Sequence, residues 1–146
     1  MGVHTLGRAA VAAALVVLVA ACGGQPEQSE KGKVFAADQT SIEVGKGKPF
    51  SIRVAENPST GYWWTVGDPQ PDTAVVRLTK KSYLADPGSE DMVGAGGSGY
   101  FTFRAQGPGQ TWIVLRKCPP NTCNGASIAA GKEKSVEWFT YSLTVR

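Results

Sequence analysis

Residues 100–115 read YFTFRAQGPGQTWIVL and hold two apolar stripes on either side of a turn rich in glycine and proline. Phe101 and Phe103 alternate with Tyr100 and Thr102 in the first stripe. In the second stripe, residues 112–115 are all apolar, which predicts a strand buried on both faces. Side chains of a strand point alternately to opposite faces, so these patterns predict two β-strands and no helix. The turn residues between the stripes are of the kind that separate strands.

The same period of two recurs along the chain, and no segment after the N-terminal region has a long helical period. Further stripes lie at residues 42–44, 50–54, 62–66, 75–78 and 139–145. Seven short strands over about 110 residues predict an all-β, immunoglobulin-like β-sandwich, with a small barrel as the alternative. Within these strands, Trp112 and Trp138 are expected to be packing residues. Tyr62 and Trp64 are expected to share one face of their strand. Trp63 is expected on the other face, exposed at the rim, with packing under a neighbouring strand as the alternative.

The first 21 residues have the pattern of an export signal. Residues 9–21 contain only Ala, Val and Leu, and a helix of that length spans about 20 Å, too short for a bilayer core of about 30 Å. The run ends Val19-Ala20-Ala21-Cys22, which resembles the lipobox of bacterial lipoproteins. The resemblance implies a signal peptide over 1–21 and an acylated Cys22 that begins the mature chain. An ordinary secreted protein or an uncleaved anchor is the alternative.

A lipid on Cys22 implies an exported protein held at the outer face of the cell membrane, or in the periplasm or outer membrane of a cell with two membranes. Residues 22–33 are expected to be a flexible tether, because GGQPEQSEKG (23–32) offers no apolar side chain to bury. Residues 34–146 then form one folded domain, which is what a chain of 146 residues allows. Nothing in the sequence requires more than a monomer.

The histidine count argues against an enzyme. His4 is the only histidine of the chain and would be lost with the signal, which excludes Ser-His-Asp and Cys-His catalysis and His-ligated metals. The adjacent carboxylates Glu90 and Asp91 belong to an acidic turn, whereas glycoside hydrolysis needs two carboxylates across a cleft. No cofactor or metal is expected, and a formal charge of +3 does not indicate nucleic-acid binding.

The chain has three cysteines. If Cys22 carries lipid, Cys118 and Cys123 remain as a pair in an oxidising compartment, and we expect them to form a disulfide. Their spacing differs from the Cys-x-x-Cys of redox proteins, and a pair of free thiols is the alternative.

Two loops differ from ordinary turns. Residues 57–62 read NPSTGY: Pro58 restricts the backbone, Asn57 and Ser59 can bond to nearby backbone groups, and Gly61 permits a positive φ, so a stiff loop is expected. Residues 93–99 read VGAGGSG and include G-x-G-x-x-G. A strand follows this run where a dinucleotide site needs a helix, so nucleotide binding is not expected.

Together these loops resemble the chagasin-type inhibitors of papain-like cysteine proteases. The first family loop reads Asn-Pro-Thr-Thr-Gly-Phe/Tyr, one further residue and Trp, and residues 57–64 match it with Ser59 for the first Thr. The second reads Gly-x-Gly-Gly after an aliphatic residue, and residues 93–97 match. The third reads Arg-Pro-Trp, and there the chain departs, with Arg116-Lys117-Cys118-Pro119-Pro120 and no Trp.

The resemblance implies a reversible competitive inhibitor whose three loops, gathered at one end of the sandwich, block the cleft of a papain-like protease. Thr60 would lie near the catalytic Cys and His of the enzyme, and the backbone of residues 57–61 is expected to be extended. Gly96 and Gly97 would let the backbone lie against the enzyme. The implied protease-binding residues are Asn57, Pro58, Ser59, Thr60, Gly61, Tyr62, Gly94, Ala95, Gly96, Gly97, Arg116, Lys117, Pro119 and Pro120. An envelope-tethered immunoglobulin-like module that binds a protein or a glycan is the alternative.

Overall fold

The computed structural model describes residues 2, 32–89, 91–123 and 137–146. All of the signal over 1–21 except residue 2, together with Cys22, most of the tether and Glu90, lies outside the described residues. Within the described residues the chain forms one 3-10 turn (Pro58–Thr60) and eight strands, which are β1 (Lys33–Ala36), β2 (Ser41–Val44), β3 (Pro49–Glu56), β4 (Trp63–Val66), β5 (Val76–Ala85), β6 (Gly97–Ala105), β7 (Gly109–Cys118) and β8 (Glu137–Val145).

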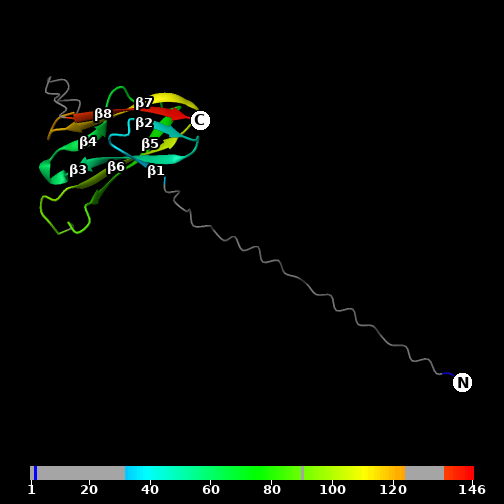
Figure 1. Cartoon of the computed structure of the whole chain (residues 1–146), viewed down its shortest axis with the longest axis horizontal. Coiled ribbons are helices and arrows are strands. Elements are labelled where there is room, and N and C mark those ends of the chain that lie inside the picture. The colour runs from blue at the N-terminus through cyan, green and yellow to red at the C-terminus, as the bar shows by residue number, and fades with distance from the viewer. Residues whose placement is uncertain (1, 3–31, 90, 124–136) are drawn as a thin grey trace.

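The strands form two four-stranded sheets that face each other (Figure 1). The first sheet has the order β1-β3-β6-β5 and the second has the order β2-β8-β7-β4. β1 runs parallel to β3 and β2 runs parallel to β8, whereas the other neighbours are antiparallel. Two separate sheets make a sandwich, so the predicted all-β sandwich is confirmed and the barrel alternative is wrong.

The core lies between the sheets and is rich in aromatic rings. Phe50 and Phe103 stack with ring centroids 5.5 Å apart, and Trp64 stacks on Phe139 at 5.7 Å. The inward residues follow the predicted period of two, as in the buried Phe101, Phe103 and Ala105 of β6. Burial raises the pKa of the Tyr141 hydroxyl well above its usual value, with a smaller contribution from Asp38, and this hydroxyl donates to the carbonyl oxygen of Ala37 at 3.0 Å.

The observed strands differ from the predicted ones in two places, the additional strand β1 and the start of β6. β1 was not predicted, because its sequence KVFA has three apolar residues in a row and shows no alternation. The parallel pairing with β3 makes it a strand. β6 begins at Gly97, inside the glycine run, because its partner β3 continues to Glu56 and pairs with it there.

The sandwich has two distinct ends. We call the end with the connections β3–β4, β5–β6 and β7–β8 the loop end. The other end, which we call the base, holds the start of β1, the turn 45–48 and the C-terminus (Figure 1). Among the described residues, no helix is long and apolar enough to cross a membrane.

Candidate functional site

Three connections leave the sandwich together at the loop end (Figure 1). The register places strand ends side by side at three points: Glu56 beside Gly97, Trp63 beside Cys118, and Lys117 beside Glu137. We call residues 57–62 the first loop, residues 86–96 the glycine loop and residues 118–123 the disulfide loop. The topology alone therefore gathers the segments that the sequence analysis selected.

The first loop is a closed turn held by its own polar groups. The Asn57 Oδ1 atom accepts hydrogen bonds from the Ser59 backbone N–H at 3.2 Å and from the Ser59 hydroxyl at 2.6 Å. The Thr60 hydroxyl donates to the Asn57 carbonyl oxygen at 2.7 Å. Gly61 ends the turn with a φ of 74°, a value that favours glycine. These hydrogen bonds agree with the prediction of a stiff loop. Asn57 is extended as expected, with φ −133° and ψ 95°, but the extended backbone expected after it is wrong, because Pro58–Thr60 is a 3-10 turn.

The first loop lies between the other two loops and contacts both. The Asn57 Nδ2 group donates to the Gly94 carbonyl oxygen in the glycine loop at 2.9 Å. On the other side, a Cβ added to Gly61 would lie 2.9 Å from the Cγ of Pro120 in the disulfide loop. Asn57, Gly61, Gly94 and Pro120 are thus brought together, and the glycine at position 61 is needed for this approach as well as for its φ.

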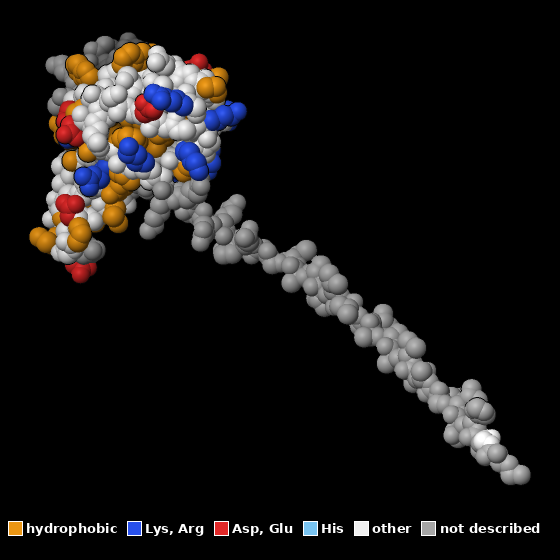
Figure 2. All heavy atoms as spheres, turned by 45° about the vertical axis from the view of Figure 1, so that its right-hand side comes forward, with side chains coloured by type: hydrophobic (Ala, Val, Ile, Leu, Met, Phe, Trp, Pro, Cys, Tyr) orange, Lys and Arg blue, Asp and Glu red, His pale blue; other side chains and the backbone are white. Residues whose placement is uncertain are grey.

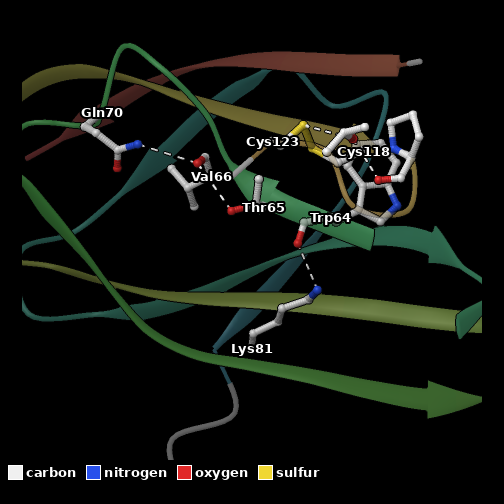
Figure 3. The surroundings of a disulfide bond; sticks show 9 residues. Trp64, Thr65, Val66, Gln70, Lys81, Cys118 and Cys123 are labelled. Carbon is white, nitrogen blue, oxygen red and sulfur yellow. Dashed lines mark hydrogen bonds between the residues drawn. A yellow bond between two sulfur atoms is a disulfide. The ribbon is translucent and has the colours of Figure 1, made fainter. Parts of the chain in front are cut away.

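The disulfide loop is a short segment at the end of β7 that a covalent bond closes. Cys118 and Cys123 form the predicted disulfide (Figure 3). Inside it, the Thr122 hydroxyl donates to the carbonyl oxygen of Pro119 at 2.7 Å. Asn121 and Cys123 adopt φ values of 58° and 57°, a backbone conformation that L-residues other than Asn and Asp rarely enter. The loop is therefore constrained, and Pro120 in it is exposed beside the first loop.

The glycines at positions 96 and 97 have different surroundings. Gly97 belongs to β6, where an added Cβ would run into the Leu84 carbonyl oxygen and the Tyr83 ring. An added Cβ at Gly96 would have its nearest neighbour, the Glu56 carbonyl oxygen, at 3.8 Å. The fold itself thus requires glycine at position 97. Of these two glycines, only Gly96 can be explained by contact with a binding partner.

An ion pair lies directly beneath the first loop. The Lys81 ammonium on β5 contacts the Glu56 Oε1 atom at 3.2 Å and donates to the Trp64 carbonyl oxygen at 2.9 Å (Figure 3). The Glu56 side chain is only 8% exposed, and its Oε2 atom has no hydrogen-bond partner. Lys81 therefore joins the edge strands of the two sheets at the residues that flank the first loop.

An open depression of about 390 Å³ lies beside the first loop, lined by Asn57, Thr60, Tyr62, Lys117 and Glu137. The Lys117 ammonium and the Glu137 carboxylate lie 3.6 Å apart at its edge. Tyr62 precedes β4 and is exposed, so the prediction that it shares the buried face of Trp64 is wrong. The structure brings the predicted site residues Tyr62 and Lys117 into this depression.

Arg116 lies apart from these loops, on the outer face of the second sheet. It borders a separate depression together with Asp68, Pro69, Trp112 and Trp138.

Trp112 and Trp138 are 57% and 63% exposed, so their predicted packing role is wrong. The prediction that the strand at 112–115 is buried on both faces is also wrong, because β7 is only partly buried on its outer face. Trp63 is exposed at the rim of the same sheet, as predicted. The outward position of an aromatic residue on a strand does not reveal whether anything covers it.

An apolar pair in the glycine loop was not among the predicted site residues. Met92 and Val93 are both exposed, and Val93 is the aliphatic residue of the matched motif. Two adjacent apolar residues between an acidic turn and a glycine run would have been the signal. No group of side chains suited to holding a metal ion occurs in the described part of the chain.

A protein-family model described as "Chagasin family peptidase inhibitor I42" matches residues 43–133, which is more than half of the chain. The chain belongs to the chagasin family of peptidase inhibitors. The match includes all three loops of the loop end, and members of this family are inhibitors and not enzymes. A comparison with curated proteins gave no match.

Solved structures with the same fold include known inhibitors. The cysteine protease inhibitor EhICP2 from Entamoeba histolytica is 22% identical with a TM-score of 0.60, over 78% of this chain and 95% of that one. Amebosin is 24% identical with a TM-score of 0.57, over 79% and 98%. PbICP-C, solved in complex with falcipain-2, is 14% identical with a TM-score of 0.51, over 81% and 93%. At these identities the likeness concerns the fold.

Proposed function

We propose that this chagasin-family protein is a reversible, competitive inhibitor of papain-like cysteine proteases and blocks the active-site cleft with its three loops. The observation that carries the proposal is the first loop, a matched motif whose Asn57 side chain closes the turn and bridges to Gly94. Two of the structural neighbours support the class of target, one described as a cysteine protease inhibitor and one in complex with falcipain-2.

In this mechanism the inhibitor occupies the cleft and contributes no chemistry. The first loop enters at the centre, with Thr60 near the catalytic residues of the enzyme, and the other two loops lie on either side. The backbone N–H groups of Thr60 and Gly61 already donate within the turn, so this segment differs from an extended substrate and presents no scissile bond. A loop that is ordered before binding also loses less conformational entropy in the complex.

The missing family tryptophan bears on affinity. Aromatic anchors contribute much of the binding free energy at many interfaces. The disulfide loop has Pro119 and Pro120 and no tryptophan. We propose that the constrained disulfide loop, with Pro119, Pro120 and Lys117, replaces the anchor and narrows the range of proteases bound. Arg116 would contact only a protease that reaches over the outer face of the second sheet.

Titration of papain with the chain from Gly23 onward tests the function, because both sheets and the core lie within that part. We expect competitive inhibition with one inhibitor per enzyme and no cleavage of the inhibitor. Reduction of the disulfide is expected to weaken inhibition. A folded protein that inhibits neither papain nor any other papain-like protease would contradict the proposal.

We further propose that residues 1–21 are a lipoprotein signal and that acylated Cys22 anchors the protein at the outer face of the cell membrane, or in the periplasm or outer membrane of a cell with two membranes. The sequence pattern before Cys22 supports this. The inhibitor would then guard the cell envelope against proteases from the cell itself or from its surroundings.

A tethered binding module without inhibitory activity is the second candidate. The exposed Trp112 and Trp138 around a depression on the second sheet favour it, because exposed aromatic residues often carry binding. If Trp112→Ala abolished binding to an envelope protein or glycan while changes in the first loop had no effect on any protease, this candidate would replace the inhibitor.

A further inference from the structure

Basic side chains gather at the base, the end opposite the three loops. The exposed cations there come from the start of β1, the turn 45–48, the base ends of β5 and β6, and the C-terminus: Lys33, Lys46, Lys48, Arg77, Arg104 and Arg146. In the described part of the chain, the acidic side chains at this end are those of Glu43 and Asp72. Figure 2, which turns this end toward the viewer, shows Lys and Arg side chains near the point where the N-terminal segment joins the domain.

The fold holds these charges close together in spite of their repulsion. Arg77 and Arg104 lie directly opposite each other on β5 and β6, a cross-strand arrangement that costs stability for like charges. Of the cations at the base, Arg146 is neutralised by Glu43, with the closest atoms 2.9 Å apart. Within the described ranges, Lys46 and Arg77 have no carboxylate partner.

The turn that carries Lys46 is fixed in place. The Lys46 backbone N–H donates to the Arg146 carbonyl oxygen at 2.7 Å, and the Gly47 N–H donates to the Ala105 carbonyl oxygen at 2.9 Å. Arg104 in turn donates to the Gly47 carbonyl oxygen at 2.9 Å. The cationic surface is therefore part of the rigid framework, whereas the exposed carboxylates Asp86 and Asp91 lie in the glycine loop at the other end.

The covalent path to the anchor ends at the same surface. β1 begins at Lys33 at the base, and only residues 23–32 separate it from Cys22. Ten residues span at most about 35 Å. Once Cys22 is acylated, the base is the part of the domain that this short connection brings to the membrane.

We propose that the base docks on a bilayer surface rich in anionic lipid headgroups, so that the three loops point away from the membrane toward incoming proteases. The inference rests on the lipid anchor at Cys22 proposed above. Charge complementarity favours an anionic membrane surface as the partner of the base, because each Lys or Arg near such a surface strengthens binding about fivefold. The attraction acts over about 10 Å at 0.1 M salt, which limits it to the cations of the base.

Vesicle binding by the unacylated chain from Gly23 onward tests the proposal without help from the anchor. We expect binding to vesicles of phosphatidylglycerol mixed with phosphatidylcholine, no binding to phosphatidylcholine alone, and loss of binding at high salt. Equal binding to both kinds of vesicle, or to neither, would overturn the proposal.

Two charge reversals locate the surface. Lys46→Glu changes the charge at the base, and Arg53→Glu makes the same change on an exposed residue in the middle of β3. We expect Lys46→Glu to weaken vesicle binding about 25-fold and Arg53→Glu to weaken it by less than threefold. Equal losses would show that net charge alone attracts the protein, and the proposed surface would be wrong.

Papain inhibition by the same proteins separates this proposal from the proposed function. Residue 46 lies at the far end from the loops, so Lys46→Glu is expected to inhibit as well as the unchanged chain. Inhibition without selective vesicle binding would refute only the docking surface. Selective vesicle binding that is lost in Lys46→Glu supports the docking surface even in a protein that inhibits no protease.

Discussion

At the residue scale, the Asn57 side chain both closes the first loop and joins it to the glycine loop. Its side chain accepts two hydrogen bonds from Ser59 and donates one to Gly94, so it shapes the first loop and links it to the glycine loop. No other amino acid of similar size has both an acceptor and a donor placed for these bonds. The identity of this residue therefore determines the relative position of the two loops.

Asn57→Ala is expected to raise the inhibition constant for papain at least tenfold, because without the three hydrogen bonds of Asn57 the first loop is no longer ordered before binding and loses more conformational entropy in the complex. Asn57→Asp keeps the acceptor for Ser59 and loses the donor to Gly94, so a smaller rise is expected. The free energy of unfolding should change little in both, since the loop is exposed. Equal inhibition constants for all three proteins would contradict this role.

Gly96 and Gly97 make a matched pair of sites. We expect Gly96→Trp to leave the melting temperature nearly unchanged, because an added Cβ there meets its nearest neighbour, the Glu56 carbonyl oxygen, at an ordinary contact distance of 3.8 Å. The same change is expected to abolish papain inhibition, because it adds a large side chain at the loop end. Gly97→Ala is expected to lower the melting temperature, because its Cβ meets the backbone of Leu84. Gly96→Trp should therefore have the higher melting temperature of the two variants and the weaker inhibition. A stable Gly96→Trp protein that still inhibits papain would show that the glycine loop does not contact the enzyme.

At the scale of elements, the edge strands β4 and β5 meet through one side chain. Lys81 reaches from the first sheet to the Trp64 carbonyl oxygen of the second and neutralises the buried Glu56. The Trp64 indole N–H donates to the Ala55 carbonyl oxygen at 2.9 Å, which adds a second link between the sheets. These contacts hold the two strands that enter and leave the first loop.

Lys81→Met is expected to lower the free energy of unfolding by about 2 kcal/mol, because Glu56 would be left buried without its partner. The exposure of Lys81 keeps this cost below that of a fully buried pair. Lys80→Met is the control, since Lys80 is the exposed neighbour on the same strand and has no ion pair in the described part of the chain. Denaturant unfolding measures both, and equal losses would mean that the ion pair contributes nothing.

At the scale of the whole molecule, the sandwich separates two surfaces. The loop end carries the matched family segments, and the base carries the cations and receives the N-terminal segment. Because β1 enters the first sheet at the base, an anchor ahead of it leaves the loop end free. A change at one surface is therefore expected to have little effect on the other.

Cys22→Ser is expected to move the protein from the membrane fraction to the soluble fraction, because two or more acyl chains are what makes such anchoring stable. Cell fractionation followed by immunoblotting measures this, and papain inhibition by the released protein should be unchanged. Retention of the Cys22→Ser protein in the membrane under high salt would mean that acylation at this residue is not the anchor.

The sequence by itself determined the all-β class, the cysteine pair and the family motifs, because each depends on short-range information. A period of two in apolar residues specifies strands with an inner face, and a separation of five positions between Cys118 and Cys123 suits a local bridge. The NPSTGY segment keeps its turn through bonds among neighbouring residues such as Asn57 and Ser59.

Only the tertiary structure decided what depends on partners far away in the chain. Periodicity separates the two faces of a strand but does not say which face is covered, so the exposure of Trp112, Trp138 and Tyr62 was predicted wrongly. The requirement for glycine at 97 comes from Leu84, and β1 exists because β3 pairs with it. The physical reason is the same in each case, since burial and pairing are properties of the neighbour as much as of the residue.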